Sequence, residues 1–188
     1  MWKKISQFFA VLFAVKLLFL SAATAETSPY KNPENTVIME LKTGKVAIEL
    51  RPDVAPKHVE RIKTLIGQKF YDGIVFHRVI SGFMAQTGDP TGTGMGGSDL
   101  PDLEQEFNAM PHIRGALSMA RSASPNSANS QFFICFEDSN FLDRNYTYFG
   151  QVIQGMEHID AIKKGSSINN GTVENPDKII SLRMANAI

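Results

Sequence analysis

The chain has little of what several common kinds of site require. It contains one cysteine in 188 residues, so no disulfide can form within it and its stability depends on a buried core. This residue, Cys135, lies in an apolar run and is expected to be buried packing rather than a nucleophile. The four histidines show no metal-ligand spacing, and neither a metal nor another cofactor is expected.

The chain also lacks an excess of either positive or negative charge. Lysine plus arginine and aspartate plus glutamate number 19 each. Removing the first 25 residues would remove three lysines and no acid, which leaves 16 basic and 19 acidic residues and a net charge of −3. Because a mildly acidic surface does not attract phosphates, no nucleic-acid partner is expected. Gly92–Gly97 is rich in glycine, but no Gly-Lys-Ser/Thr follows, which argues against a nucleotide-binding loop.

Long apolar runs are scarce, and the one present is at the N-terminus. Lys3 and Lys4 precede an apolar stretch that extends through Leu20, and Ala23-Thr24-Ala25 is typical of a cleavage site. Lys16 interrupts the stretch and argues against a membrane-spanning helix, because a central lysine costs about 2.5–3.5 kcal/mol on insertion scales. The pattern predicts a secretory signal peptide, with an uncleaved anchor in the inner membrane as the alternative.

The chain is therefore expected to contain one folded domain. Residues 1–25 are predicted to be a signal peptide cleaved after Ala25, residues 26–35 a flexible lead-in with two prolines, and residues 36–188 the domain. After cleavage, no later segment is long and apolar enough to span a membrane. We expect an exported protein.

Short apolar alternations dominate the predicted domain and are typical of β-strands. Apolar residues at helical spacing follow Pro56 as far as Gly67, and a second helix is expected from near Met156 to Gly165. We expect a mainly β fold, a closed antiparallel β-barrel of about eight strands capped by two α-helices. The expected strands are residues 37–41, 46–50, 74–80, 83–87, 115–119, 131–136, 147–153 and 179–184.

One segment combines a charge with apolar strand residues. Arg78, Phe83, Met84 and Gln86 lie within nine residues of alternating sequence. A buried strand has no structural need for an arginine, because an unpaired interior charge is costly. The combination indicates a partly apolar pocket with one strong donor aimed into it, which suits an apolar substrate that carries a carbonyl or an amide.

Three sequence blocks together resemble the signature of the cyclophilin family of peptidyl-prolyl isomerases. They come in the family order and at close to the family spacing, and the resemblance runs from about Thr36 to the C-terminus. It implies a cyclophilin-like barrel and an isomerase that needs no cofactor. The blocks are Phe76–Asp89, then Gly115–Ala120 with Ser124–Cys135, then Asn140–Asp143 with Tyr146–Val152.

Rotation about a bond that precedes proline requires no covalent intermediate. The barrier is about 18–20 kcal/mol, and uncatalysed exchange takes tens to hundreds of seconds. Millisecond turnover requires a rate gain of about 10⁴–10⁵, or about 5–7 kcal/mol. Arg78 is the predicted donor, because its charged planar guanidinium can bond the substrate carbonyl and direct an N–H toward the proline nitrogen. The resemblance implies that Gln86 orients Arg78 and contacts the substrate backbone.

The resemblance also assigns the substrate-binding residues. Ala120 matches the small residue beside the proline pocket, and Arg121 matches a position whose main chain pairs with the bound peptide. In strand geometry, Phe132 and Phe133 point to opposite faces; by resemblance Phe133 takes the site and Phe132 the core. The residues that match the proline pocket are Phe83, Met84, Phe133 and Leu142.

Two positions depart from the best-known eukaryotic members. Phe141 stands where they carry tryptophan, and Tyr146 stands at or near their active-site histidine. Tyrosine keeps a hydroxyl donor and an aromatic edge, so proline binding is expected to survive. Loss of the indole N–H removes a donor associated with cyclosporin, so we expect activity with weak cyclosporin binding, a pattern that resembles the bacterial members.

The sequence therefore predicts a periplasmic peptidyl-prolyl isomerase, expected to be a monomer. Its partners would be X-Pro-containing peptides and unfolded client proteins. The X-Pro bonds would lie in extended or unfolded exported proteins. One alternative is a non-catalytic proline-peptide-binding chaperone domain, although Arg78 and Gln86 are both present. A small-ligand carrier is another, but many alternating Phe, Ile and Val residues indicate a filled barrel. Ser118 and Ser130 show no histidine partner, so no serine nucleophile is expected.

Overall fold

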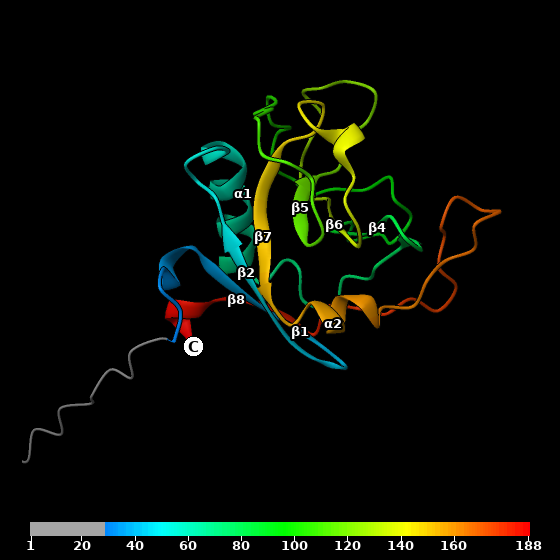
Figure 1. The fold of residues 1–188 in the computed structure, drawn as a ribbon, viewed down its shortest axis with the longest axis horizontal. Helices are drawn as coiled ribbons and strands as arrows, with labels where there is room; N and C mark the ends of the chain where they lie inside the picture. The colour runs from blue at the N-terminus through cyan, green and yellow to red at the C-terminus, as the bar shows by residue number, and fades with distance from the viewer. Residues whose placement is uncertain (1–28) are drawn as a thin grey trace, which may run out of the picture.

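The computed structural model describes residues 29–188 (Figure 1). The predicted signal peptide and the first residues of the predicted lead-in lie outside the described residues. Within the rest of the lead-in, Pro33–Asn35 forms a short 3-10 helix, and the side chain of Asn32 donates to Glu49 at 3.1 Å. No helix in the described part of the chain is long and apolar enough to cross a membrane.

Eight antiparallel strands form one curled sheet, as the sequence predicts. Their order across the sheet is β3-β4-β6-β5-β7-β2-β1-β8, and every pair of neighbours is antiparallel. The strands are β1 Thr36–Leu41, β2 Gly44–Leu50, β3 Arg78–Ile80, β4 Met84–Thr87, β5 Ala116–Met119, β6 Phe132–Cys135, β7 Tyr148–Gln154 and β8 Ser181–Met184.

The two edges of the sheet are joined by the segments that precede β3 and β8. Val75 forms an isolated antiparallel bridge with Lys178, and the backbone N–H of Phe76 donates to the carbonyl of Asp177 at 2.9 Å. The N–H of Ile179 donates to Ile74 at 2.9 Å. Because residues 74–76 pair with residues 177–179 and not with β4, β3 is shorter than the strand expected over residues 74–80.

Two α-helices accompany the sheet. Helix α1, Pro56–Gly67, has the predicted bounds, with proline in its first turn and Val59, Ile62, Leu65 and Ile66 buried. Helix α2, Met156–Asp160, is shorter than expected. The N–H of Lys163 donates to the Asp177 carboxylate at 2.8 Å and that of Gly165 to Val79 at 2.8 Å, so tertiary contacts draw this segment away from helical geometry.

Side chains fill the interior of the sheet. Met39, Val46, Phe132 and Phe149 are among the buried residues that form the main core with the apolar face of α1. One space of about 10 Å³ lies between core residues of β1, β2, β5, β6, β7, β8 and α1, about what one water molecule needs. This space is too small for a carried small molecule.

A second apolar cluster lies on the other face of β4, β5 and β6. Strand alternation in β6 sends Phe132 and Ile134 to the main core, and Phe133 and Cys135 to this outer apolar cluster. Its buried members are Met84, Ala116, Phe133, Cys135, Leu142 and Tyr148, with Phe83, Ala120 and Tyr146 packed against them.

Candidate active site

The strand register places polar and apolar site residues in one row across the sheet. Arg78 on β3 faces Gln86 on β4, which in turn faces Phe133 on β6. Directly opposed residues of paired strands project on the same face, so these three side chains are neighbours. Arg78 and Phe133 are two strand spacings apart, about 10 Å, which leaves room between them for a small ring and an amide.

The guanidinium of Arg78 is held on two sides. Its Nη1 donates to Gln86 Oε1 at 3.1 Å, its Nε to the backbone carbonyl of Asn170 at 3.0 Å, and its Nη2 to Asn170 Oδ1 at 3.0 Å. Three of the five N–H groups are used, and one on each terminal nitrogen has no partner within residues 29–188. Partial burial lowers the pKa of Arg78, but an arginine keeps its charge at neutral pH.

Gln86 is itself fixed by a relay of side-chain amides. Its Nε2 donates to Gln131 Oε1 at 2.9 Å, and Gln131 Nε2 donates to the carbonyls of Gly94 and Gly96 at 3.0 and 2.8 Å. Each amide NH₂ therefore faces an acceptor, which leaves the Gln86 oxygen for Arg78. The predicted orienting role of Gln86 has a structural basis in this relay.

The apolar residues predicted to hold proline lie together in or against the outer apolar cluster. Met84, Phe133 and Leu142 are buried, with Leu142 supplied by the 3-10 helix Asn140–Leu142. Phe83 packs against the cluster, and its ring lies 5.4 Å from the ring of Phe141. Phe141 is 69% exposed, so it stands at the rim of the site.

Arg121 supports Tyr146 through its side chain. The guanidinium carbon lies 4.5 Å from the centre of the Tyr146 ring, and Nη2 donates to the carbonyl of Asn145 at 3.0 Å. The Tyr146 ring in turn packs edge-on against Phe133 at 5.8 Å. Stacking of a guanidinium on an aromatic face is a stabilising arrangement, so Arg121 holds the predicted site tyrosine against the pocket. The resemblance had assigned Arg121 only a main-chain contact with peptide.

A groove of about 540 Å³ adjoins the row on the side of Gln86. The glycine-rich loop forms part of it, and Asp89 fixes this loop by accepting from the N–H groups of Thr91 and Gly94 at 2.7 and 2.6 Å. Burial alone would raise the pKa of Asp89, but these and neighbouring donors lower it to about 2. The lining residues are Gln86, Gly94, Met95, Gly96, Gly97, Ser98, Asp102, Ala120, Arg121, Ser122, Ser127, Asn129 and Gln131.

A serine does have a histidine partner, contrary to the expectation from sequence. His112 Nε2 lies 2.9 Å from Ser118 Oγ, and His112 Nδ1 lies 2.9 Å from Asp143 Oδ1. The sequence concealed this because the loop before β5 folds His112 back over the strand. Ser118 and His112 are fully buried, so substrate cannot reach them and the chain of bonds is structural.

The single cysteine is inert, because burial raises the pKa of the Cys135 thiol to about 12.

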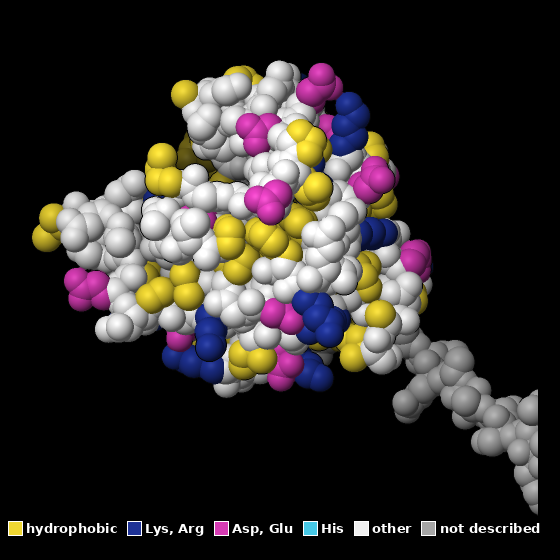
Figure 2. Space-filling model, turned by 180° about the vertical axis from the view of Figure 1, so that it is seen from behind, with side chains coloured by type: hydrophobic (Ala, Val, Ile, Leu, Met, Phe, Trp, Pro, Cys, Tyr) yellow, Lys and Arg dark blue, Asp and Glu magenta, His cyan; other side chains and the backbone are white. Residues whose placement is uncertain are grey.

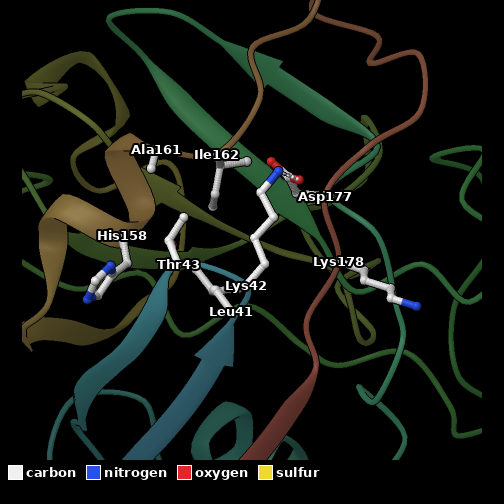
Figure 3. Close-up of a pocket in the computed structure, with 8 residues that line it drawn as sticks. All are labelled: Leu41, Lys42, Thr43, His158, Ala161, Ile162, Asp177 and Lys178. Atoms are coloured by element: carbon white, nitrogen blue, oxygen red, sulfur yellow. Dashed lines mark ion pairs between the residues drawn. The ribbon is translucent and has the colours of Figure 1, made fainter.

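Other features of the described surface offer no comparable chemistry. Figure 3 shows a pocket of about 10 Å³ between the β1–β2 turn and α2, where Lys42 pairs with Asp177. It holds at most one water molecule. Acidic and basic side chains are interspersed on the face seen in Figure 2, without a continuous basic surface there. No His, Cys, Asp and Glu side chains converge as a metal site would require within residues 29–188.

Comparison with known proteins decides the family. The family model described as "Cyclophilin type peptidyl-prolyl cis-trans isomerase/CLD" matches residues 36–184. The chain belongs to the cyclophilin family. It is a cyclophilin-type peptidyl-prolyl cis-trans isomerase, as the three sequence blocks predict.

Relatives and solved structures agree with this assignment. The cyclophilin is 52% identical over 182 residues to "Probable peptidyl-prolyl cis-trans isomerase" of Brucella suis, covering 91% of this chain and 93% of that protein. It is 43% identical over 133 residues to "Peptidyl-prolyl cis-trans isomerase-like 3" of Rattus norvegicus, covering 69% and 82%.

Two crystal structures share the fold of this cyclophilin. AquaCyp293 of Hirschia baltica superimposes with a TM-score of 0.73 at 32% identity, covering 81% of this chain and 74% of that one. A Cryptosporidium parvum cyclophilin type peptidyl-prolyl cis-trans isomerase, determined in the presence of the dipeptide Ala-Pro, superimposes with a TM-score of 0.73 at 30% identity, covering 79% and 98%.

The sequence missed two residues of this site. Gln131 lies within the Ser124–Cys135 block and directly precedes the Phe132-Phe133 pair, but nothing in its spacing indicates a bond to Gln86. Asn170 lies 92 residues beyond Arg78 in the chain. The run Asn169-Asn170-Gly171 indicates only a turn, so its contact with Arg78 was not predictable from sequence.

Proposed function

We propose that Arg78 supplies the catalytic donor of this isomerase above a pocket for the proline ring. The observation that carries this proposal is the guanidinium itself: it is fixed by Gln86 and Asn170, yet keeps one unpartnered N–H on each terminal nitrogen. It stands in the same row as Phe133, a wall of the apolar cluster. A proline ring against Phe133 would place the preceding amide near Arg78.

The proposed mechanism relies on a bond that exists only in the twisted state. In the planar amide the nitrogen lone pair is delocalised into the carbonyl, so it accepts no hydrogen bond. Rotation localises the lone pair, and an N–H of Arg78 then stabilises it while the other free N–H bonds the substrate carbonyl. Because the first of these bonds is absent in the ground state, it lowers the barrier without trapping the substrate.

Isomerase activity and the pocket role of Phe133 are tested together by cis-to-trans conversion of a short X-Pro peptide. The wild-type residues 26–188 are compared with the Phe133→Leu variant. Leucine keeps much of the apolar volume but loses the flat ring wall, so we expect KM to rise about 5- to 10-fold with kcat changed less. The wild-type chain should accelerate conversion strongly. Peptide binding without acceleration would instead identify a non-catalytic proline-binding chaperone domain.

The proposed substrates are extended or unfolded segments of exported proteins. The groove beside Gln86 can accommodate residues that flank the proline, and its polar lining favours main-chain contacts over one particular side chain. Phe141 presents no N–H at the rim, which supports weak cyclosporin binding. A monomer would suffice, because the proposed catalytic and pocket residues all come from one chain.

We propose a periplasmic location on the pattern of residues 1–25. N-terminal sequencing of the protein recovered from fractionated cells should give Glu26 as the first residue, in the periplasmic fraction. Recovery of Met1 in the inner-membrane fraction would favour the anchored alternative, and recovery in the cytoplasmic fraction would contradict export.

A further inference from the structure

The segment that follows α2 lies along the free edge of β3. The N–H of Gly165 donates to the carbonyl of Val79, the N–H of Val79 to Gly171, both at 2.8 Å, and the N–H of Val173 to His77 at 3.1 Å. The approach is close: a side chain at Gly165 would place its Cβ 1.9 Å from the carbonyl oxygen of Gly171. Main-chain bonds therefore dock this segment beside Arg78. In Figure 1 the segment is part of the orange loop that projects at one end of the molecule.

One residue of this segment has an unusual conformation. Asn170 has φ of +52°, in the left-handed region that asparagine tolerates better than most residues with a side chain. The conformation turns its backbone carbonyl and its side-chain oxygen toward the same guanidinium, at 3.0 Å each. Two of the three bonds that hold Arg78 within the described residues thus come from Asn170 alone.

We propose that Asn170 is the positioning residue for Arg78, fixing the plane of the guanidinium so that its two free N–H groups face the proline pocket. The inference rests on the proposed role of Arg78. Gln86 holds one terminal nitrogen, and one bond permits the guanidinium to pivot. Asn170 holds Nε and the other terminal nitrogen, so three bonds from two directions define the plane. Folding has then already fixed the donor, so its loss of conformational entropy does not add to the barrier of each isomerisation.

The experiment compares Asn170→Gly with Asn175→Gly. Asn175 belongs to the same connection, has φ of +49° and makes no hydrogen bond to Arg78, so the two variants share any effect of added flexibility. We expect Asn170→Gly to lower kcat about 5- to 20-fold with KM within about threefold. Asn175→Gly should match the wild type. Glycine keeps the main-chain carbonyl that accepts from Nε but lacks the Oδ1 that accepts from Nη2, so the Arg78 Nη2–H resonance should exchange faster with solvent in Asn170→Gly only.

A double variant separates this inference from the proposed function. If Asn170 acts through Arg78, adding Asn170→Gly to Arg78→Ala should cause no further loss of kcat. A wild-type kcat in Asn170→Gly, with Arg78→Ala strongly impaired, would overturn the positioning role and leave the donor role standing. An equal loss in both backgrounds would also overturn it, because Asn170 would then act independently. Full activity in Arg78→Ala would overturn both.

Discussion

Replacing Arg78 with alanine should lower kcat/KM for a short X-Pro peptide by about 10²–10³-fold, because loss of one preorganised transition-state donor costs about 2.7–4 kcal/mol. The loss should fall mainly on kcat, since the bond to the proline nitrogen forms only in the twisted amide. The partly exposed side chain and its two neighbours can be solvated when it is removed, so the fold should persist. Steady-state isomerisation with a circular-dichroism spectrum of each variant checks both statements.

Two matched variants show whether the effect belongs to the guanidinium. Arg78→Lys keeps a positive charge but loses the planar fork that bonds Gln86 and Asn170, so its kcat/KM should remain at least about tenfold below wild type. Arg144→Gln removes an arginine from the loop beside Tyr146 and should leave activity unchanged. An Arg78→Ala variant within threefold of wild type would rule out the proposed donor.

The free energy of unfolding should fall steeply as the pH drops below about 6.5, the ordinary histidine pKa. Burial lowers the pKa of His58, His77 and His112 in the folded protein. The carboxylates Glu106, Asp143 and Asp89 oppose this at His58, His112 and His77 in turn, but burial is the larger effect on the pKa of all three. Below about pH 6.5 the histidines of the unfolded chain bind more protons than those of the folded chain, so lowering the pH favours unfolding.

The slope measures how many buried histidines take part. Each contributes at most about 1.4 kcal/mol per pH unit, between about pH 6.5 and its lowered folded pKa. Urea unfolding at intervals from pH 8 to pH 5 should show little change above pH 7 and increasing loss below 6.5. His77→Leu should make the slope shallower by up to about 1.4 kcal/mol per pH unit, because it removes one buried ring whose pKa burial lowers. A flat profile from pH 8 to pH 5 would show that these histidines protonate as easily in the folded protein.

Local pattern was sufficient for most of the fold. Alternation of apolar residues predicted the strands, and in β6 it separated Phe132 in the main core from Phe133 in the outer apolar cluster. Proline at its start and glycine at its end predicted the bounds of α1. The second helix was predicted too long, because Lys163 and Gly165 bond distant partners whose positions a local pattern does not contain.

In the candidate site, the residues on strands were predictable from sequence, and the loop residues that orient them were not. Its strand residues follow from local sequence, because Arg78, Gln86 and Phe133 are brought into one row by regular pairing. The residues that orient them come from loops: Gln131 through an amide relay, and Asn170 through a left-handed turn. Loop geometry depends on contacts across the whole chain, so the sequence predicted the support from Gln86 but could not reveal the support from Gln131 and Asn170.

The most direct test of the central claim is two-dimensional exchange NMR on a peptide with both X-Pro isomers visible, at a saturating concentration of wild type or Arg78→Ala. The spectra give the rate of isomerisation on the enzyme, and the bound chemical shifts report binding separately. Arg78 as donor predicts that the variant still binds the peptide through the apolar pocket, while the on-enzyme rate falls by two decades or more. An unchanged on-enzyme rate, with any loss confined to binding, would contradict the account.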